Sequence, residues 1–148
     1  MIRFKMIASS YLILIQNGKI LLSRRFNTGY EDGKYSLPAG HIEDNESLTR
    51  GAAREIFEEI GVTLAPQACK LVHVMHRKEN DIRMDFFFTQ PHFFQSGAGQ
   101  APVNKEPEKC DDLSWFSLES LPENTIPYIR HAIECYQKKI FYSEFGWK

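Results

Sequence analysis

The sequence holds few cysteines, no long apolar run and almost no net charge. Its three cysteines are widely spaced and form no CxxC pair, so neither a zinc knuckle nor a redox motif is indicated. We expect Cys69, Cys110 and Cys135 to be buried or half-buried free thiols of a reducing compartment. The formal net charge of −1 argues against a broadly basic surface, so we expect no stable nucleic-acid partner.

The longest apolar run, residues 11–15, is far short of the about 20 residues that cross a bilayer. The N-terminal stretch MIRFKMIASSYLILIQNGK has a basic start and a short apolar segment, as signal peptides do. It lacks a small-residue cleavage site and leads directly into another strand-like run. We therefore interpret it as a strand, and we expect a cytoplasmic protein that makes no membrane contact.

The length and the strand-like segments predict one domain over residues 1–148. YLILIQ and KILLSRR, residues 11–16 and 19–25, flank an Asn-Gly pair that suits the type I′ turn of a β-hairpin. Further strand-like segments are CKLVHVMHR, IRMDFFFTQ and, as the last strand, DLSWFSL. We expect residues 93–107, which are rich in Gly, Ala, Pro and Gln, to form a loop.

Two segments have helical character. The first runs from about Glu46 to Ile60, with Asp44 or Asn45 as its N-cap and Gly61 at its C-terminal end. Its apolar side chains fall on one arc, and Gly51 in its middle suggests close packing. The second is expected over residues 128–141. Strands, a helix, more strands and a closing helix predict an α/β domain whose helices cover a sheet.

Three glutamates crowd one face of the first helix. Glu55, Glu58 and Glu59 in REIFEEIG stand at i, i+3 and i+4, where like charges weaken an isolated helix by roughly 0.2–0.5 kcal/mol per pair. A solvated acidic face is the ordinary explanation of such a cluster. The alternative is that the three carboxylates form a binding site for a cation, which would offset their mutual repulsion.

The surrounding residues favour the cation. Gly40 is followed after five residues by Glu46, and Glu46 after seven residues by REIFEEIGV, residues 54–62. These residues match every fixed position of the Nudix box, Gx5Ex7REUxEExGU with U aliphatic. Over residues 40–62 the sequence therefore resembles the Nudix hydrolase family, which includes MutT-like proteins. The resemblance implies the α/β (α+β) fold class, with an α/β/α sandwich that places a mixed β-sheet between helices.

The resemblance also implies a Mg²⁺-dependent pyrophosphohydrolase, with Mn²⁺ as an alternative metal. Mg²⁺ prefers hard oxygen ligands, and it neutralises phosphate charge and lowers the pKa of bound water. Carried over, Glu55 and Glu59 bind the metal, and Glu58 is a further ligand or the base that acts on water. A backbone carbonyl near Gly40 adds an oxygen, and Arg54 orients the glutamates.

Other residues are weaker candidates. Glu46 takes a structural role, because a carboxylate in the first helical turn favours the helix dipole. EPEKC followed by Trp resembles the nucleotide-diphosphatase branch of the family. Family members often recruit a further acid from a loop beyond the box, as a metal ligand or as the base. Glu106 and Glu108 are preferred here over Asp111 and Asp112 and are assigned to substrate binding, with ordinary surface charge as the alternative. Arg24 and Arg25 are candidates for a phosphate clamp, of which alternation along a strand lets at most one reach the site, and exposed strand-end charge is the alternative. His41, beside the box glycine, either contacts phosphate or caps the loop. Residues 85–88 could stack on a base but are more simply a strand core.

We expect a small-molecule nucleotide substrate, a nucleoside di- or triphosphate or a related diphosphate derivative. An ADP-ribose or dinucleotide polyphosphate hydrolase stays an alternative, although Arg77 and Lys78 stand where ADP-ribose members tend to have Pro, and KEND where diadenosine members tend to have Tyr. A Nudix-fold module that binds nucleotides without hydrolysis is the alternative of another class, but such modules usually lose the box glutamates. A homodimer is one option for assembly, because dimers are frequent among the proteins it resembles.

Overall fold

The structure is a computed structural model of the whole chain, and it describes residues 1–91, 93 and 101–148. Part of the predicted loop 93–107 therefore lies outside the described residues. The two helices and nine strands of the described chain are ordered as β1 (Ile7–Leu12), β2 (Ile15–Gln16), β3 (Lys19–Arg25), β4 (Tyr35–Ser36), β5 (Ala39–His41), α1 (Leu48–Ile60), β6 (Lys70–Lys78), β7 (Ile82–Thr89), β8 (Cys110–Ser117), α2 (Pro127–Gln137) and β9 (Tyr142–Phe145), with a short 3₁₀ turn η1 at Pro66–Ala68. No described helix is long and apolar enough to cross a membrane.

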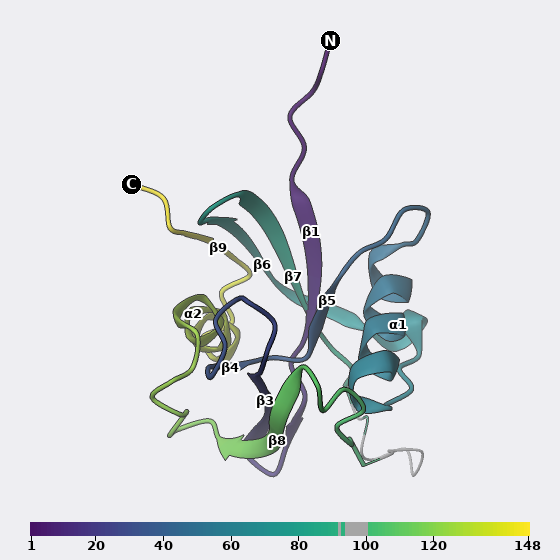
Figure 1. Cartoon of the computed structure of the whole chain (residues 1–148), viewed down its shortest axis with the longest axis vertical. Coiled ribbons are helices and arrows are strands. Elements are labelled where there is room, and N and C mark those ends of the chain that lie inside the picture. Colours follow the sequence, from purple (N-terminus) through teal and green to yellow (C-terminus); the bar gives the residue numbers. More distant parts are fainter. Residues whose placement is uncertain (92, 94–100) are drawn as a thin grey trace.

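The fold is built on two sheets. The larger sheet has the order β5-β1-β7-β6-β9, and it is mixed, because β1 is parallel to β7 while β5 and β6 run antiparallel to their neighbours β1 and β7. The smaller sheet joins β2, β3 and β4, with β8 paired to β3. Helices α1 and α2 lie on opposite sides of the larger sheet (Figure 1). The predicted α+β class with a mixed sheet between helices is confirmed.

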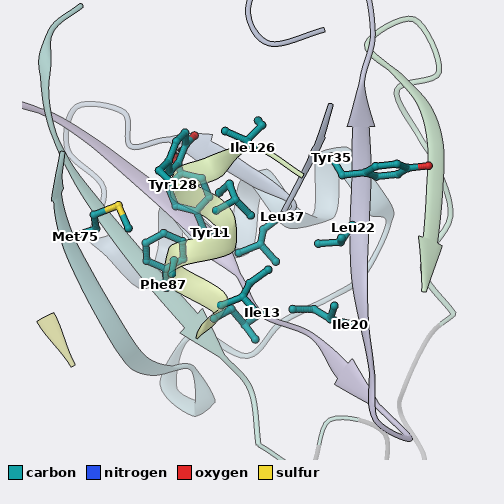
Figure 2. Packing of buried hydrophobic residues seen from close by; sticks show 13 residues of the cluster. Tyr11, Ile13, Ile20, Leu22, Tyr35, Leu37, Met75, Phe87, Ile126 and Tyr128 are labelled. Atoms are coloured by element: carbon teal, nitrogen blue, oxygen red, sulfur yellow. Dashed lines mark hydrogen bonds between the residues drawn. The ribbon is translucent and has the colours of Figure 1, made fainter. Parts of the chain in front are cut away.

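Alternation along β1 divides the core between the two helices. Tyr11 and Ile13 face α2 and pack with Phe87 and Tyr128 in the larger cluster (Figure 2). Leu12 faces the other way and packs in a second cluster with residues of α1. Phe87 and Phe88 are buried, as the strand-core explanation of residues 85–88 predicted. The three cysteines are free, and each is buried or half-buried.

The predicted hairpin forms, but its first strand is divided. Asn17 and Gly18 both have positive φ, of 53° and 75°, as a type I′ turn requires. The chain leaves the larger sheet after Leu12 and pairs in the smaller sheet from Ile15. Two residues therefore carry the chain from one sheet to the other, a change that the continuous apolar run does not reveal.

The first helix begins later than predicted. Ser47, not Asp44 or Asn45, is the N-cap of α1, and its side chain accepts a hydrogen bond from the Arg50 amide at 3.3 Å. Asn45 has φ of 64° and belongs to the preceding turn. At the other end the prediction holds: Gly61 caps the helix in the left-handed region, with φ of 71°.

The second helix ends earlier than predicted, and DLSWFSL is not in the last strand. α2 stops at Gln137, because Lys139 adopts a positive φ of 59° and turns the chain. Residues 142–145 then pair as β9 in parallel with β6. A short strand whose partner lies far away in the sequence has no hairpin signal, so the sequence does not predict β9.

Candidate active site

A cleft of about 670 Å³ opens between α1, the larger sheet and the loop of residues 26–34. The glutamates at 55, 58 and 59 line it from α1, beside Ala39 and Gly40 of β5. Farther across the sheet, Arg77 of β6 and Tyr128 of α2 line it as well. The volume lies within the range of small-molecule sites in proteins.

The absence of a side chain at Gly40 makes room for Glu55. A Cβ at position 40 would lie 2.1 Å from Cδ of Glu55 and 2.3 Å from its Oε2, which no real Cβ tolerates. Glu59 lies against the same strand and accepts a hydrogen bond from the Ala39 amide at 3.0 Å. Two carboxylates of α1 are therefore seated against the backbone of β5.

Arg54 ties this arrangement together. Its guanidinium binds both oxygens of Glu46, at 3.0 and 2.7 Å, and its NH1 contacts Glu55 at 2.9 Å and Glu58 at 3.4 Å. The same side chain donates to the carbonyl of His41 at 3.2 Å, which links α1 to β5. Arg54 thus touches two of the three cluster glutamates directly.

Glu46 anchors Arg54 rather than the helix dipole. It lies before the N-cap, so the predicted first-turn position is wrong, because the helix starts later than its sequence pattern suggests. Its carboxylate accepts from Arg54 and from the Glu43 amide, and these bonds hold its pKa down at about 2. Gly51 completes the packing, since a Cβ there would lie 2.7 Å from Oε1 of Glu46.

The two seated carboxylates are hard to ionise without a cation. Burial raises the pKa of Glu59 to about 8, the Ala39 amide opposes this rise, and the charges of Glu55 and Glu106 add to it. Burial also raises the pKa of Glu55, although Arg54 counteracts it. A positive ion beside these groups would favour their charged forms.

The donors suit a hard divalent cation without forming a closed cage. Within residues 1–91, 93 and 101–148, no group of three His, Cys, Asp or Glu side chains converges closely enough to hold an ion by itself. The carboxylates turn instead to Arg54 and to the Ala39 amide. Mg²⁺ usually takes only one or two carboxylates and completes its shell with water and substrate phosphates. Glu55 and Glu59, seated at a backbone that a Cβ would obstruct, fit that requirement.

Both candidate arginines line the cleft. The register between β3 and β8 shifts between Arg24 and Arg25, and this irregularity breaks the alternation that predicted only one of them there. Arg24 is paired with Asp111 at 2.7 Å. Arg25 instead donates to neutral groups, the Tyr30 carbonyl at 2.6 Å and the Thr28 hydroxyl at 3.1 Å.

The acids of the segment before β8 separate in space. Glu106 lines the cleft, whereas Glu108 is exposed and does not line it. Asp111 is bound to Arg24, and Asp112 accepts hydrogen bonds from Tyr35 and Ser114. Only Glu106 among these four is brought beside the glutamates of α1.

The floor of the cleft holds a buried ion pair that the sequence does not predict. Arg77, which is 2% exposed, donates to Asp85 at 2.6 Å, and Asp85 also accepts from the Tyr11 hydroxyl at 3.2 Å. The Arg77 guanidinium lies 3.7 Å from the centre of the Tyr128 ring. The sequence shows one acidic residue beside the aromatic residues of IRMDFFFTQ, but it does not indicate to which face of the sheet this side chain points.

His41 lies at the edge of the same floor. Its Nε2 is 3.1 Å from NH1 of Arg83. Burial, with the Arg83 charge second, lowers the pKa of the imidazole. Because a guanidinium only donates, Nε2 is the acceptor in this pair, and the proton of the neutral ring is on Nδ1.

The profile of the NUDIX domain matches residues 6–135. The chain belongs to the Nudix family. Curated relatives include the phosphatase NudJ of Escherichia coli (strain K12), which is 27% identical with 76% of each chain covered. Another is the NAD-capped RNA hydrolase NudC of Stutzerimonas stutzeri (strain A1501), 29% identical over 78% of this chain; this Nudix chain spans only 38% of the length of that relative.

Solved Nudix structures have the same fold. A MutT NUDIX hydrolase from Burkholderia pseudomallei superimposes with a TM-score of 0.74 at 25% identity, with 88% of this chain and 98% of the other covered. Members of the Nudix family are hydrolases that act on nucleoside diphosphate derivatives, and this chain is accordingly a Nudix hydrolase.

Proposed function

We propose that the chain is a Mg²⁺-dependent pyrophosphohydrolase that cleaves a phosphoanhydride bond of a nucleoside di- or triphosphate or a related nucleoside diphosphate derivative. The observation that carries this proposal is the seating of Glu55 and Glu59 against the backbone of β5, beside the cleft arginine Arg25. Carboxylates that hold a cation and a guanidinium that faces an anion are the two complementary halves of a diphosphate site.

Glu55 and Glu59, with the carbonyl of Gly40, would hold the Mg²⁺ or Mn²⁺ ion. Such an ion supplies charge neutralisation at the phosphates and a lower pKa for bound water. Arg54 keeps the carboxylates in place through its bonds to Glu46 and Glu55. Because these carboxylates occupy the guanidinium, it is not free to bind substrate. The role of Arg54 is therefore to orient the metal ligands.

Glu58 is the residue we assign to water. Its side chain is 51% exposed at the cleft, and its ion pair with NH1 of Arg54 is long, at 3.4 Å. The Glu58 carboxylate can therefore turn toward a substrate. In the reaction the water oxygen bonds to phosphorus while the bridging P–O bond breaks. The proton of the water passes to the Glu58 carboxylate, or Glu58 holds the water in line as a further metal ligand.

Arg25 and Glu106 are the cleft residues we assign to substrate contact outside the box, while Arg24 has Asp111 as a competing partner. Glu108 is a matched control, because it is an exposed glutamate two positions away from Glu106. Glu106→Gln should change turnover or KM more than Glu108→Gln. Equal effects of the two variants would remove the special role of Glu106.

The test is a substrate panel with Mg²⁺. Nucleoside triphosphates, nucleoside diphosphates, ADP-ribose, diadenosine polyphosphates and NAD would be incubated with the protein, and nucleoside monophosphate release would be followed by chromatography. Reaction in ¹⁸O-labelled water would identify the phosphorus that is attacked. Chelation should abolish turnover and added Mg²⁺ should restore it. Tight binding of a nucleotide without turnover of any would instead identify a non-hydrolysing binding module.

A further inference from the structure

The loop of residues 26–34 is fastened across the cleft by Tyr30. This loop joins β3 to β4, and Tyr30 in its middle lines the cleft. The Tyr30 hydroxyl donates to Oε2 of Glu79 at 2.7 Å, just beyond the end of β6. Glu79 is held in turn by NH1 of Arg77 at 3.1 Å, and Arg77 belongs to the buried pair with Asp85. The loop is thus linked to the rigid floor of the cleft.

The same residue holds Arg25. The backbone carbonyl of Tyr30 accepts from Nε of Arg25 at 2.6 Å, and the guanidinium lies 5.3 Å from the centre of the Tyr30 ring. A second bond, at 3.1 Å, joins NH2 of Arg25 to the Thr28 hydroxyl. Every one of these contacts to Arg25 comes from the loop. The position of its guanidinium therefore follows the position of the loop.

Arg25 also has an unneutralised charge. In the described part of the chain, no carboxylate oxygen lies within 4.0 Å of the Arg25 guanidinium, whereas Arg24, Arg54, Arg77 and Arg83 each have at least one ion-pair partner. Arg25 is thus the cleft arginine best able to meet an anion.

We propose that Tyr30 is a positioning residue, which acts through its hydroxyl bond to Glu79 to hold the 26–34 loop and with it the guanidinium of Arg25 over the diphosphate of the substrate. This inference rests on the proposed function for the identity of the anion. The tether itself is independent of any activity. The Tyr30 hydroxyl also accepts a long hydrogen bond of 3.4 Å from NH1 of Arg77. The short bond to Glu79, at a partly exposed position, contributes only about 1 kcal/mol, so its loss should alter the loop far more than the global stability.

Tyr30→Phe tests the tether, because it keeps the backbone carbonyl and the ring and removes only the hydroxyl. Tyr142→Phe is the control: Tyr142 on β9 donates to Glu144 at 2.8 Å, the same kind of Tyr–Glu bond, in a more exposed pair that does not line the cleft. We expect Tyr30→Phe to raise KM about fivefold, the equivalent of one hydrogen bond, with kcat within about twofold of wild type. Tyr142→Phe should leave both constants unchanged.

A double-mutant cycle shows whether the effect passes through Arg25. In an Arg25→Ala background, Tyr30→Phe should have no further effect on KM, because contacting residues couple whereas independent ones add. Glu79→Gln keeps an oxygen that can accept from Tyr30 and should rescue most of the loss seen in Glu79→Ala. Full additivity of Tyr30→Phe with Arg25→Ala would overturn the proposal.

Two further measurements separate the tether from the proposed function. Amide hydrogen exchange in residues 26–34 should be about fivefold faster in Tyr30→Phe than in Tyr142→Phe, since a bond of about 1 kcal/mol has been removed from the closed loop. Calorimetry with inorganic pyrophosphate and Mg²⁺ should show weaker binding in the same variant. If no nucleotide is turned over but both changes occur, the proposed function fails and the tether stands. Unchanged exchange and unchanged pyrophosphate binding would overturn the tether.

Discussion

Replacing Glu59 by glutamine tests whether this carboxylate stores a proton that the metal must displace. Glu59→Gln keeps an oxygen that accepts from the Ala39 amide and removes the titration. In the metal-free wild type, burial raises the pKa from the usual 4.5 to about 8. Between these two values the folded protein binds more protons than the unfolded chain. The free energy of unfolding therefore falls as the pH rises.

The magnitude follows from the size of the shift. One extra proton in the folded state corresponds to about 1.4 kcal/mol per pH unit, so the interval from about pH 5 to pH 8 amounts to at most about 4 kcal/mol. The contribution is fully present below the unfolded pKa and is lost as the pH rises through the folded one. Glu59→Gln should flatten this part of the curve and should be more stable than the metal-free wild type at about pH 8.

The assay is urea unfolding with a chelator at several pH values, with the curve at about pH 5 as the internal control, because a protonated glutamate and a glutamine are nearly equivalent there. Mg²⁺ at a hundredfold excess over its dissociation constant should stabilise the wild type by about 2.7 kcal/mol and the variant by much less. Parallel curves for wild type and variant across the whole range would refute the buried proton. An equal response of both proteins to Mg²⁺ would remove Glu59 from the ligand set.

Three other substitutions address separate parts of the site. Glu58→Gln should lower kcat by about 100-fold or more without altering urea unfolding, since its side chain is 51% exposed, and near wild-type turnover would contradict its role. Gly40→Ala should weaken the response of activity to Mg²⁺, because its Cβ would displace the Glu55 carboxylate, and an unchanged metal titration would argue against that seat. Asp85→Ala should cost about 3 kcal/mol or more in urea unfolding, because Arg77 loses its fully buried partner and keeps Glu79, whose side chain is 34% exposed. Asp81→Ala, which breaks the exposed pair with Arg83, should cost less than about 1 kcal/mol, and similar losses in both would show that the buried pair is not special.

The residues whose place follows from local spacing were predictable from the sequence. Glu55, Glu58 and Glu59 share a face because a helix brings positions i, i+3 and i+4 together, and the structure lines the cleft with all three. Gly61 and the Asn-Gly hairpin were predictable for the same reason, since both depend on a backbone conformation at one or two residues. The contact between Gly40 and Glu55 agrees with the Nudix spacing, but its atomic cause, a collision with any Cβ, is visible only in three dimensions.

The residues that escaped prediction depend on partners far away in the chain. β9 exists because β6 offers an edge about seventy residues earlier, and no local pattern in residues 142–145 separates it from the end of a helix. Arg77 and Asp85 are charged positions in two strands, and alternation says that each points to one face without saying which face is buried. That face becomes identifiable only when α2 brings Tyr128 over Arg77 and β1 brings Tyr11 to Asp85. The glutamate face of α1 was therefore predictable alone, whereas the floor and the Tyr30 tether, which connect segments far apart in the sequence, required the assembled fold.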